Sequence, residues 1–468
     1  MCSKIVGTIM AIAASFMLPC AVNGDSMPPT SASANGRLVT PPTQVSVSMY
    51  ELNNAGAKVV PLVQCTNGSG NRSTKWGCTA YCTTGDFQQH CTNPLIHPPP
   101  VPAPLGQPGH VYPFSTNQVT VNIDGSAAYN GYTYNRYLRD VVAQETNPEA
   151  FHAKAVLAQA IAARTYAYYQ VSAANETVID NSASYQVYVP FRYDSRKRYY
   201  GDYRPPIEAA MQDRIYLVPY PNPPPYVFAE YFADRPGSTL SGATPNLIAV
   251  ADPISQTGCG SSVSGHGHGL SQQGASRWAR GDGYFNINSS ASCPWSVSWQ
   301  NTRQILAHYY TNTVFYDASG NAISPTFWRW NALEIRNLPP AVVQPGAVYT
   351  LDVQVQNTGA WSWTSQDDIR LSYQVCQGTS CTNTSGLYNV AMPQNLPPGN
   401  AAWFNGLSVP IPANWRGPAA IRLDVRRGPD WLAAGGWYTQ DILICVSSCN
   451  PRFLPTMRRG GIFPDSSS

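Results

Sequence analysis

Apolar residues between positions 147 and 170 recur at intervals of three and four, the spacing of one face of an α-helix. The segment reads NPEAFHAKAVLAQAIAARTYAYYQ, with Asn147 in the position of an N-cap and Pro148 in the first helical position. The pattern predicts a helix over the whole segment. Its buried face is expected to consist of Phe151, Ala155, Ala158, Ala162, Thr165 and Tyr169.

Two shorter helices are predicted further along the chain, at residues 271–280 and 302–310. The strand-like stretch QVTVNID precedes all three helices, and Tyr- and Pro-rich segments that we interpret as strands and loops lie between the first helix and the second. This mixture predicts a central domain of the α+β class over residues 111–318.

Beyond Phe327 the apolar residues alternate with polar ones in short runs separated by turn residues. Runs such as YTLDVQVQNTGAWSW, DIRLSYQVC and AAIRLDVRR predict a β-sandwich over residues 331–447, followed by a tail at 448–468. VQNTGAWSW and the later GGWY resemble the Ig-like domains that are appended to bacterial surface enzymes. This region has no catalytic cluster, and its Trp361, Trp363, Trp403 and Trp415 are expected in the core rather than stacked on sugars.

The N-terminal third contains no long periodic segment. Lys4 precedes an apolar run that ends at Leu18, which predicts a signal peptide over residues 1–24 and hence export; a lipid anchor on Cys20 is the alternative. A flexible spacer is expected at 25–42, a small Cys-rich module that opens with the strand QVSVSMYEL at 43–96, and a Pro-rich linker at 97–110. No stretch is long and apolar enough to predict a transmembrane segment.

Composition narrows the class of partner. Charged residues make up 12% of the 468 residues and the net charge is +3, so no nucleic-acid partner is expected, whereas abundant Tyr, Trp, Pro and Gly favour a carbohydrate ligand. Removal of a signal peptide would take Cys2 and Cys20 away and leave an even set, which predicts disulfides in an oxidising compartment. For the first four cysteines, a zinc site with His90 is the alternative. The disulfide candidates are Cys65, Cys78, Cys82, Cys91, Cys259, Cys293, Cys376, Cys381, Cys445 and Cys449.

Candidate chemistry lies in the Gly-rich stretch GHGHGLSQQGASRWARGDG, residues 265–283. On a strand, His266 and His268 would face the same way, as in some zinc and copper sites. No neighbouring Asp, Glu or His pattern supplies a third ligand. A Gly-rich turn whose histidines form local hydrogen bonds is therefore favoured over a metal site, and neither a metal nor a cofactor is expected.

Three segments resemble one family in the same order along the chain. GHGHGLSQQGA is similar to the G-H-G-V-G-M-S-Q-x-G-A signature of the SpoIID/LytB family, VVAQETNPEAFHAKAVLAQAIAARTYAYY resembles its V-V-x-x-E-M-P segment and the helix after it, and QILAHYYTNT resembles its closing motif. The resemblance covers roughly residues 111–316. It implies remodelling of bacterial peptidoglycan, either as a lytic transglycosylase that cleaves MurNAc-GlcNAc bonds or as a non-catalytic binding protein or enhancer of a cell-wall amidase.

The resemblance places the family's catalytic acid at Glu145. A carboxylic acid kept protonated in a partly desolvated site can donate its proton to a glycosidic oxygen. The resulting carboxylate can then deprotonate the MurNAc 6-hydroxyl, which closes onto C1 and gives a 1,6-anhydro end, so one carboxylate suffices. The alternative for Glu145 is a solvated residue at the end of a helix.

The resemblance also suggests residues that bind the glycan strand. Arg164 would hold a sugar or the ionised acid, or alternatively tie its helix to a buried carboxylate. His266 matches the motif histidine, whereas His268 stands where the family has an aliphatic residue. Ser271 is more readily interpreted as a helix cap. The substrate-binding candidates are Arg164, Gln159, Tyr231, His266, Ser271 and Gln272.

The sequence departs from the family in two places. Arg235, Pro236 and Gly237 replace a Ser-Gly-Gly stretch after Tyr231, which changes the expected loop. Some relatives bind zinc through a His and two Cys, but DNSASYQVYVP has Tyr185 where the last Cys would lie, so no zinc is expected there. Cys259 and Cys293 bracket the Gly-rich stretch and are predicted to form a disulfide across it.

Overall fold

The computed structural model describes most of the central and C-terminal parts of the chain. The predicted signal peptide, the Pro-rich linker, the cysteines 65, 78, 82 and 91 with their zinc alternative, and almost all of the C-terminal tail lie outside the described residues. The described residues are 40–52, 57–61, 118–125, 136–146, 151–172, 174, 176–189, 193, 204–221, 225–284, 291–382 and 389–449.

A small sheet closes one end of the molecule. Strand β1 (Gln44–Ser48) lies between β4 (Gln118–Asn122), with which it is antiparallel, and β5 (Ile179–Asp180), with which it is parallel. Val45, Val47 and Met49 of this segment are buried in one cluster with side chains of helices α2 and α3. The strand predicted to open a separate Cys-rich module is therefore part of the core of the central domain. It is followed by the hairpin of β2 (Tyr50–Leu52) and β3 (Lys58–Pro61).

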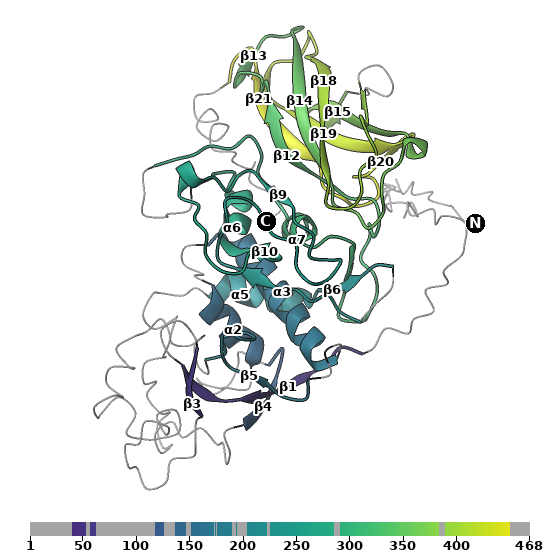
Figure 1. Cartoon of the computed structure of the whole chain (residues 1–468). Helices are drawn as coiled ribbons and strands as arrows, with labels where there is room; N and C mark the ends of the chain where they lie inside the picture. Colours follow the sequence, from purple (N-terminus) through teal and green to yellow (C-terminus); the bar gives the residue numbers. More distant parts are fainter. Residues whose placement is uncertain are drawn as a thin grey trace, which may run out of the picture.

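Helix α3 (Ala153–Ser172) runs through the middle of the central domain (Figure 1). It packs against α2 (Tyr137–Glu145), α5 (Arg204–Asp213), α6 (Gln272–Arg280) and α7 (Thr302–Tyr309). It is consequently buried around most of its circumference, so the prediction of a single buried face was wrong. It also begins later than Asn147 predicted, since His152 precedes it and accepts a hydrogen bond from Lys154 N at its Nδ1 atom.

The two shorter helices are confirmed. Helix α6 (Gln272–Arg280) is capped by Ser271, whose hydroxyl accepts a hydrogen bond from Gly274 N at 3.0 Å, and α7 (Thr302–Tyr309) begins with a capping box at Asn301. Short strand pairs connect these helices to the rest of the domain. They are β6 (Tyr216–Pro219) with β11 (Thr313–Tyr316), β7 (Tyr231–Phe232) with β10 (Leu270–Ser271), and β8 (Gly237–Ser238) with β9 (Ala251–Asp252).

The C-terminal region is rich in β-strands, as the alternating pattern predicted. Its strands form two sheets that share one hydrophobic core, and Trp363 is fully buried there while Trp361, Trp403 and Trp415 are half-buried. One sheet has the order β12 (Trp330–Arg336), β14 (Val348–Asn357), β18 (Ala401–Pro410). The other has the order β13 (Val342–Val343), β21 (Gln440–Val446), β19 (Gly417–Arg427), β15 (Ile369–Gln377), β16 (Ser380–Cys381), with β17 (Val390–Ala391) beside β15 and β20 (Asp430–Trp431) beside β19.

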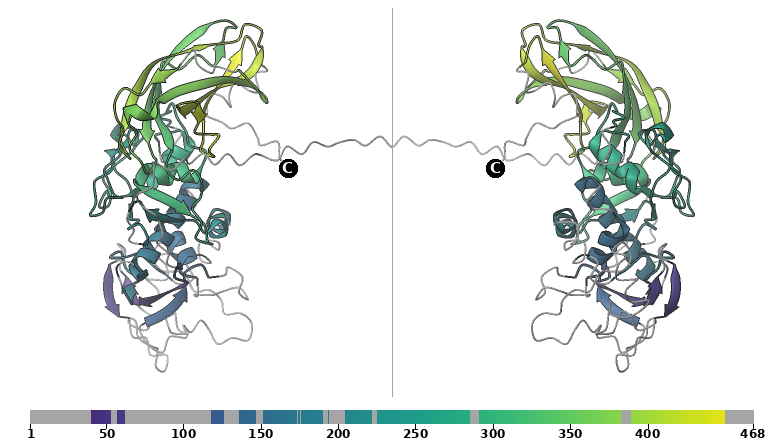
Figure 2. Two further views of the ribbon diagram at one scale, coloured as in Figure 1. Left: turned by 90° about the vertical axis from the view of Figure 1, so that its right-hand side faces the viewer. Right: turned by 90° about the vertical axis from the view of Figure 1, so that its left-hand side faces the viewer.

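The β-region is joined to the central domain by a continuous hydrophobic core rather than by a spacer. Trp299 donates a hydrogen bond from Nε1 to the carbonyl of Ala332, and buried His308 of α7 shares a 2.7 Å hydrogen bond with Gln356 of β14. Burial lowers the pKa of His308 to about 4, so this imidazole is neutral in the interface. Figure 2 shows the resulting elongated molecule, with the β-region at one end, the helices between, and the sheet of β1 at the other end.

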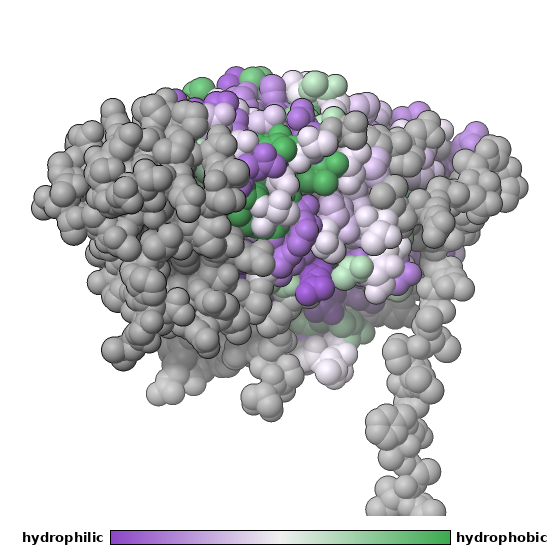
Figure 3. Space-filling model, turned by 90° about the horizontal axis from the view of Figure 1, so that it is seen from below, coloured by the Kyte–Doolittle hydropathy of each residue, from purple (hydrophilic) through white to green (hydrophobic). Residues whose placement is uncertain are grey.

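Three disulfides lie within the described residues: Cys259–Cys293, Cys376–Cys381 and Cys445–Cys449. The first confirms the predicted tie across the Gly-rich stretch. None of the helices in the described part of the chain is long and apolar enough to cross a membrane. Figure 3 shows, on the coloured part of the face seen from below, hydrophilic residues with several hydrophobic ones among them.

Candidate functional site

Glu145 is the last residue of helix α2, and the chain turns away directly after it. Thr146 ends the helix by hydrogen-bonding the carbonyl of Val142 with both its backbone N–H and its hydroxyl. The Glu145 side chain is partly exposed, and its Oε1 atom accepts a 2.5 Å hydrogen bond from Val187 N. Within the described ranges this carboxylate forms no ion pair. Burial therefore dominates, and it raises the pKa of Glu145 from 4.5 to about 7.

The start of helix α6 is fastened to the end of α2 at this point. Gln272 donates a hydrogen bond from Nε2 to the backbone carbonyl of Glu145 at 3.0 Å, although the two residues are 127 positions apart. The sequence suggested Gln272 as a ligand of a sugar. That role stays a prediction; in the structure its amide nitrogen holds the backbone of Glu145, and Ser271 beside it caps α6.

Neutral side chains line the interior side of Glu145. Tyr137 donates its hydroxyl proton to Gln186 Oε1 at 3.1 Å, and Gln186 Nε2 donates to the hydroxyl of Tyr231 at 3.2 Å. Burial, with a smaller contribution from the charge of Glu145, raises the pKa of the Tyr231 phenol well above its ordinary value. Tyr137 and Gln186 were not predicted from the sequence. Gln186 stands in the DNSASYQVYVP stretch, which was considered only for zinc ligands.

The Gly-rich stretch forms a tight loop next to Tyr231. Gly265, Gly267 and Gly269 have φ angles of +92°, +87° and +73°, and a Cβ on Gly269 would lie 2.0 Å from the carbonyl oxygen of Glu230. Glycine is thus required where the loop meets the strand β7. The parallel pairing of Leu270 with Tyr231 holds the loop in this place.

Only His266 makes a local contact of the kind that the turn interpretation predicts, and the other ring contacts of the two histidines reach β7 and the residue before it. His266 Nε2 lies 3.0 Å from the carbonyl oxygen of Tyr231, and because a carbonyl only accepts, Nε2 carries the proton. The other ring nitrogen, Nδ1, accepts a hydrogen bond from His268 N at 3.0 Å. His266 itself is exposed and His268 is half-buried.

A third potential ligand stands beside these histidines, contrary to the sequence-based expectation. Glu230 Oε2 lies 3.5 Å from His268 Nδ1, and one ligand atom from each of Glu230, His266 and His268 lies within 4.8 Å of the others. Sequence spacing gave no sign of this cluster, because Glu230 is far from the loop in the chain and is brought there by the pairing of β7 with β10.

Below the loop lies a network of buried charges. Arg277 of α6 binds both carboxylate oxygens of Asp234, at 2.6 and 3.1 Å, and Asp234 also accepts a hydrogen bond from Ser262 N. Next to it, Asp252 accepts hydrogen bonds from Trp278 Nε1 and the Tyr309 hydroxyl. This network supports the loop from one side. The Cys259–Cys293 disulfide holds its flank. Cys259 is the last residue of the short 3₁₀-helix Thr257–Cys259.

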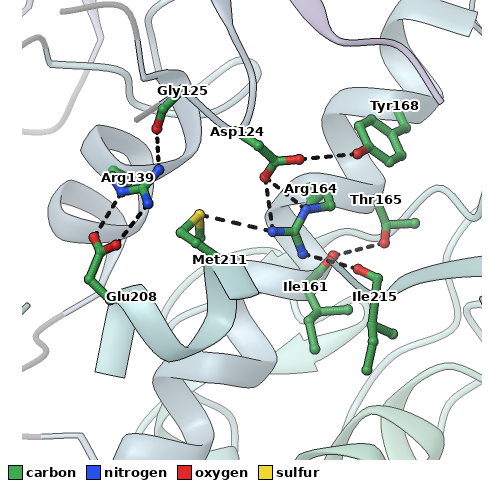
Figure 4. A network of polar contacts seen from close by, with 10 residues as sticks. All are labelled: Asp124, Gly125, Arg139, Ile161, Arg164, Thr165, Tyr168, Glu208, Met211 and Ile215. Atoms are coloured by element: carbon green, nitrogen blue, oxygen red, sulfur yellow. Dashed lines mark hydrogen bonds and ion pairs between the residues drawn. The ribbon is translucent and has the colours of Figure 1, made fainter. Parts of the chain in front are cut away.

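Arg164 and Gln159 occupy the interior of α3. Arg164 is fully buried and binds Asp124 Oδ1 through Nε at 3.0 Å and through one terminal nitrogen at 2.9 Å (Figure 4). This contact supports the structural alternative for Arg164, a tie between its helix and a carboxylate. Gln159 is 1% exposed, and neither atom of its amide has a hydrogen-bond partner in the part of the chain that the structure describes. Neither residue reaches the surface to bind a glycan.

Comparison with known proteins gives one family and several distant structural matches. No curated protein sequence matches the chain. The CARDB domain of the PF1109 protein of Pyrococcus furiosus, solved in complex with di-metal ions, is 16% identical, with 28% of this chain and 97% of that chain covered and a TM-score of 0.16. The sporulation control protein Spo0M of Bacillus subtilis is 14% identical, with 26% of this chain and 50% of that chain covered and a TM-score of 0.17.

The family match falls on the helices that carry Glu145 and Arg164. It begins next to Asp124, the partner of Arg164, and ends at the last residue of α5, so the Gly-rich loop lies beyond it. Residues 123–213 of this chain are thus similar to the SpoIID family, described as Stage II sporulation protein.

Proposed function

We propose that this chain is an exported enzyme that remodels peptidoglycan, acting as a lytic transglycosylase on MurNAc-GlcNAc bonds with Glu145 as its single acid and base. The observation that carries the proposal is the state of Glu145. It is a partly exposed carboxylate with a pKa of about 7, inside a segment similar to the SpoIID family.

The surroundings of Glu145 suit proton transfer. A group whose pKa lies near neutrality is populated in both protonation states at working pH, so it can first donate and then accept a proton. Oε1 is held by Val187 N, and within the described residues Oε2 has no hydrogen bond, which leaves this oxygen for the substrate. The neighbours Tyr137, Gln186 and Tyr231 bring no charge that would fix the carboxylate in its ionised form.

The reaction needs only this carboxyl group. The acid gives its proton to the glycosidic oxygen as the bond from that oxygen to C1 of MurNAc breaks. The carboxylate then takes the proton of the 6-hydroxyl of the same MurNAc, whose oxygen bonds to C1. The products are a 1,6-anhydro-MurNAc end and a free GlcNAc hydroxyl, with Glu145 again protonated and no water consumed.

Export and action in the cell wall are consistent with the covalent structure. The three disulfides of the described residues need an oxidising compartment, which peptidoglycan enzymes share. The C-terminal β-region, which we interpret as Ig-like, is fused to the central domain through a common core, so it would present the site to the glycan rather than move independently.

The test is mass spectrometry of soluble products after incubation of the protein with peptide-free peptidoglycan glycan. Wild type should release products that end in 1,6-anhydro-MurNAc, and Glu145→Gln should lower their rate by about 10²–10⁴-fold. Glu334→Gln, which alters a partly exposed carboxylate in the β-region, is the matched control and should act like wild type. Equal product formation by Glu145→Gln would remove Glu145 from the mechanism.

A second candidate is a non-catalytic glycan-binding protein or enhancer of a cell-wall amidase. The observation that favours it is the loop after Tyr231. Arg235, Pro236 and Gly237 replace the Ser-Gly-Gly stretch of the family there, and the Asp234 carboxylate is bound by Arg277. If neither wild type nor Glu145→Gln releases products while both are pulled down with the glycan, this candidate replaces the first. Stimulation of a purified amidase would then identify the partner.

A further inference from the structure

Two distant chain segments bring three metal-ligating side chains to one side of the Gly-rich loop. Glu230 precedes strand β7, and His266 and His268 precede strand β10, with which β7 pairs in parallel. The loop carries both histidines on the same side, with their ring centroids 5.1 Å apart. The ligand atoms of all three residues lie within 4.8 Å of one another.

One pair of these atoms already has the spacing of two ligands of a metal ion, and the third lies close enough to complete the set after a small movement of its side chain. Nitrogen and oxygen ligands lie about 2.0–2.1 Å from zinc, so two ligands of a tetrahedral ion are about 3.3–3.4 Å apart. Glu230 Oε2 and His268 Nδ1 are 3.5 Å apart. Two His and one Glu are also a ligand set found in catalytic zinc sites, where water or substrate occupies the fourth position.

His266 is oriented as a ligand should be. Metal-binding histidines usually donate their second ring N–H to a carbonyl or carboxylate, which fixes the ring and its tautomer. Here Nε2–H donates to the carbonyl of Tyr231, and Nδ1 keeps its lone pair. That lone pair now accepts the N–H of His268, a hydrogen bond that an ion bound at Nδ1 would replace.

We propose that Glu230, His266 and His268 bind one divalent transition-metal ion, of which Zn²⁺ fits the ligand types best, with the fourth position open to solvent. The site is separate from the acid-base step proposed for Glu145, which uses no metal. Both adjoin Tyr231, whose carbonyl faces His266 and whose hydroxyl faces Gln186. A bound ion would fasten the Gly-rich loop to the strand that positions Tyr231.

The test is calorimetric titration of the chelator-treated, full-length protein with Zn²⁺, without glycan. Other parts of the chain contain His and Cys, so the readout is the difference between variants: wild type should bind one ion more than His268→Val, and Glu230→Gln should weaken that site at least about 10-fold. His268 has no positive φ, so its backbone accepts valine. His152→Gln, a partly exposed histidine outside the cluster, should bind like wild type.

A second readout guards against misfolded variants. Zn²⁺ should raise the melting temperature of wild type and of His152→Gln by more than that of His268→Val, with circular dichroism showing that all are folded. Equal binding of Zn²⁺ by wild type and His268→Val, or no binding by either, would overturn the site. Because no glycan is present, neither result depends on whether Glu145 cleaves glycan strands.

Discussion

Two carboxylates near helix α6, those of Asp234 and Glu145, differ in their burial and in the presence of a cation. Asp234 is fully buried and bound at both oxygens by Arg277. Glu145 is partly exposed and is held only by the N–H of Val187. A buried charge with a hydrogen-bonded partner is a structural element, whereas a carboxylate that lacks one is pushed towards its neutral form.

A raised pKa alone does not mark a catalytic group in this protein. Burial also raises the pKa of Asp252 to about 6 and that of Asp424 to about 7. Both are enclosed, since Asp252 is 0% exposed and Asp424 1%. Asp424 accepts hydrogen bonds from Trp330 Nε1 and from Ala433 N, inside the β-region. Glu145 differs from these two because it is partly exposed.

The largest effect is expected from removing the cation that pairs with Asp234. Arg277→Ala would leave Asp234 ionised and buried without its partner, which should lower the free energy of unfolding by about 3–5 kcal/mol. Urea denaturation at neutral pH measures this. A loss below about 1 kcal/mol would mean that Asp234 is not held as a buried ion.

Removing the charge of Glu145, which has no cationic partner, should instead raise the free energy of unfolding, by an amount that depends on pH. Folding raises the pKa of Glu145 from 4.5 to about 7, so the folded protein holds this proton more tightly than the unfolded chain does. The free energy of unfolding of wild type therefore falls progressively as pH rises from about 4.5 to about 7. Glu145→Gln stays neutral. It should match wild type at pH 4 and exceed its free energy of unfolding by about 1–3 kcal/mol at pH 8.

Denaturation of wild type and Glu145→Gln across this pH range checks the prediction. His308, whose pKa burial lowers to about 4, destabilises both proteins alike below pH 6.5, so it cancels from the difference. A difference that does not change with pH would show that Glu145 titrates normally.

The smallest effect is expected at an ion pair that is partly exposed rather than buried. Arg422 and Asp441 form an ion pair as close as many buried ones, at 2.9 Å, but their side chains are 40% and 33% exposed. Arg422→Ala should therefore cost only about 0–1 kcal/mol in the same denaturation experiment. A cost equal to that of Arg277→Ala would show that burial is not what separates the two pairs.

Local features of the candidate site were accessible from the sequence. The cap at Ser271, helices α6 and α7, and the Cys259–Cys293 disulfide were all predicted and are confirmed. Glu145 was selected through its resemblance to a family motif, and that selection stays a prediction. The burial of α3 was mispredicted, because Ala-rich periodicity reveals one apolar face but not that further helices cover the polar one.

Contacts between distant segments could not be predicted in this way. Nothing in the local pattern around Glu230 shows that it faces His268, and nothing around Arg164 shows that its partner is Asp124. Strand β1 was placed in the Cys-rich module for the same reason. Alternation predicts that a segment is a strand, but the partner strand is chosen by burial of Val45 and Val47 against the helices.

The sequence by itself determined helices α6 and α7, most of helix α3, the extended C-terminal region, and where glycine is needed. These depend on backbone conformation and on spacing within a few residues. It did not reveal helix α5, which lies in a stretch that we interpreted as strands and loops. The tertiary structure decided which charged groups are paired and which are not. That outcome depends on the parallel register of β7 and β10 and on the packing of α6 against α3, which place Gln272 at Glu145, Arg277 at Asp234, and Glu230 beside two histidines.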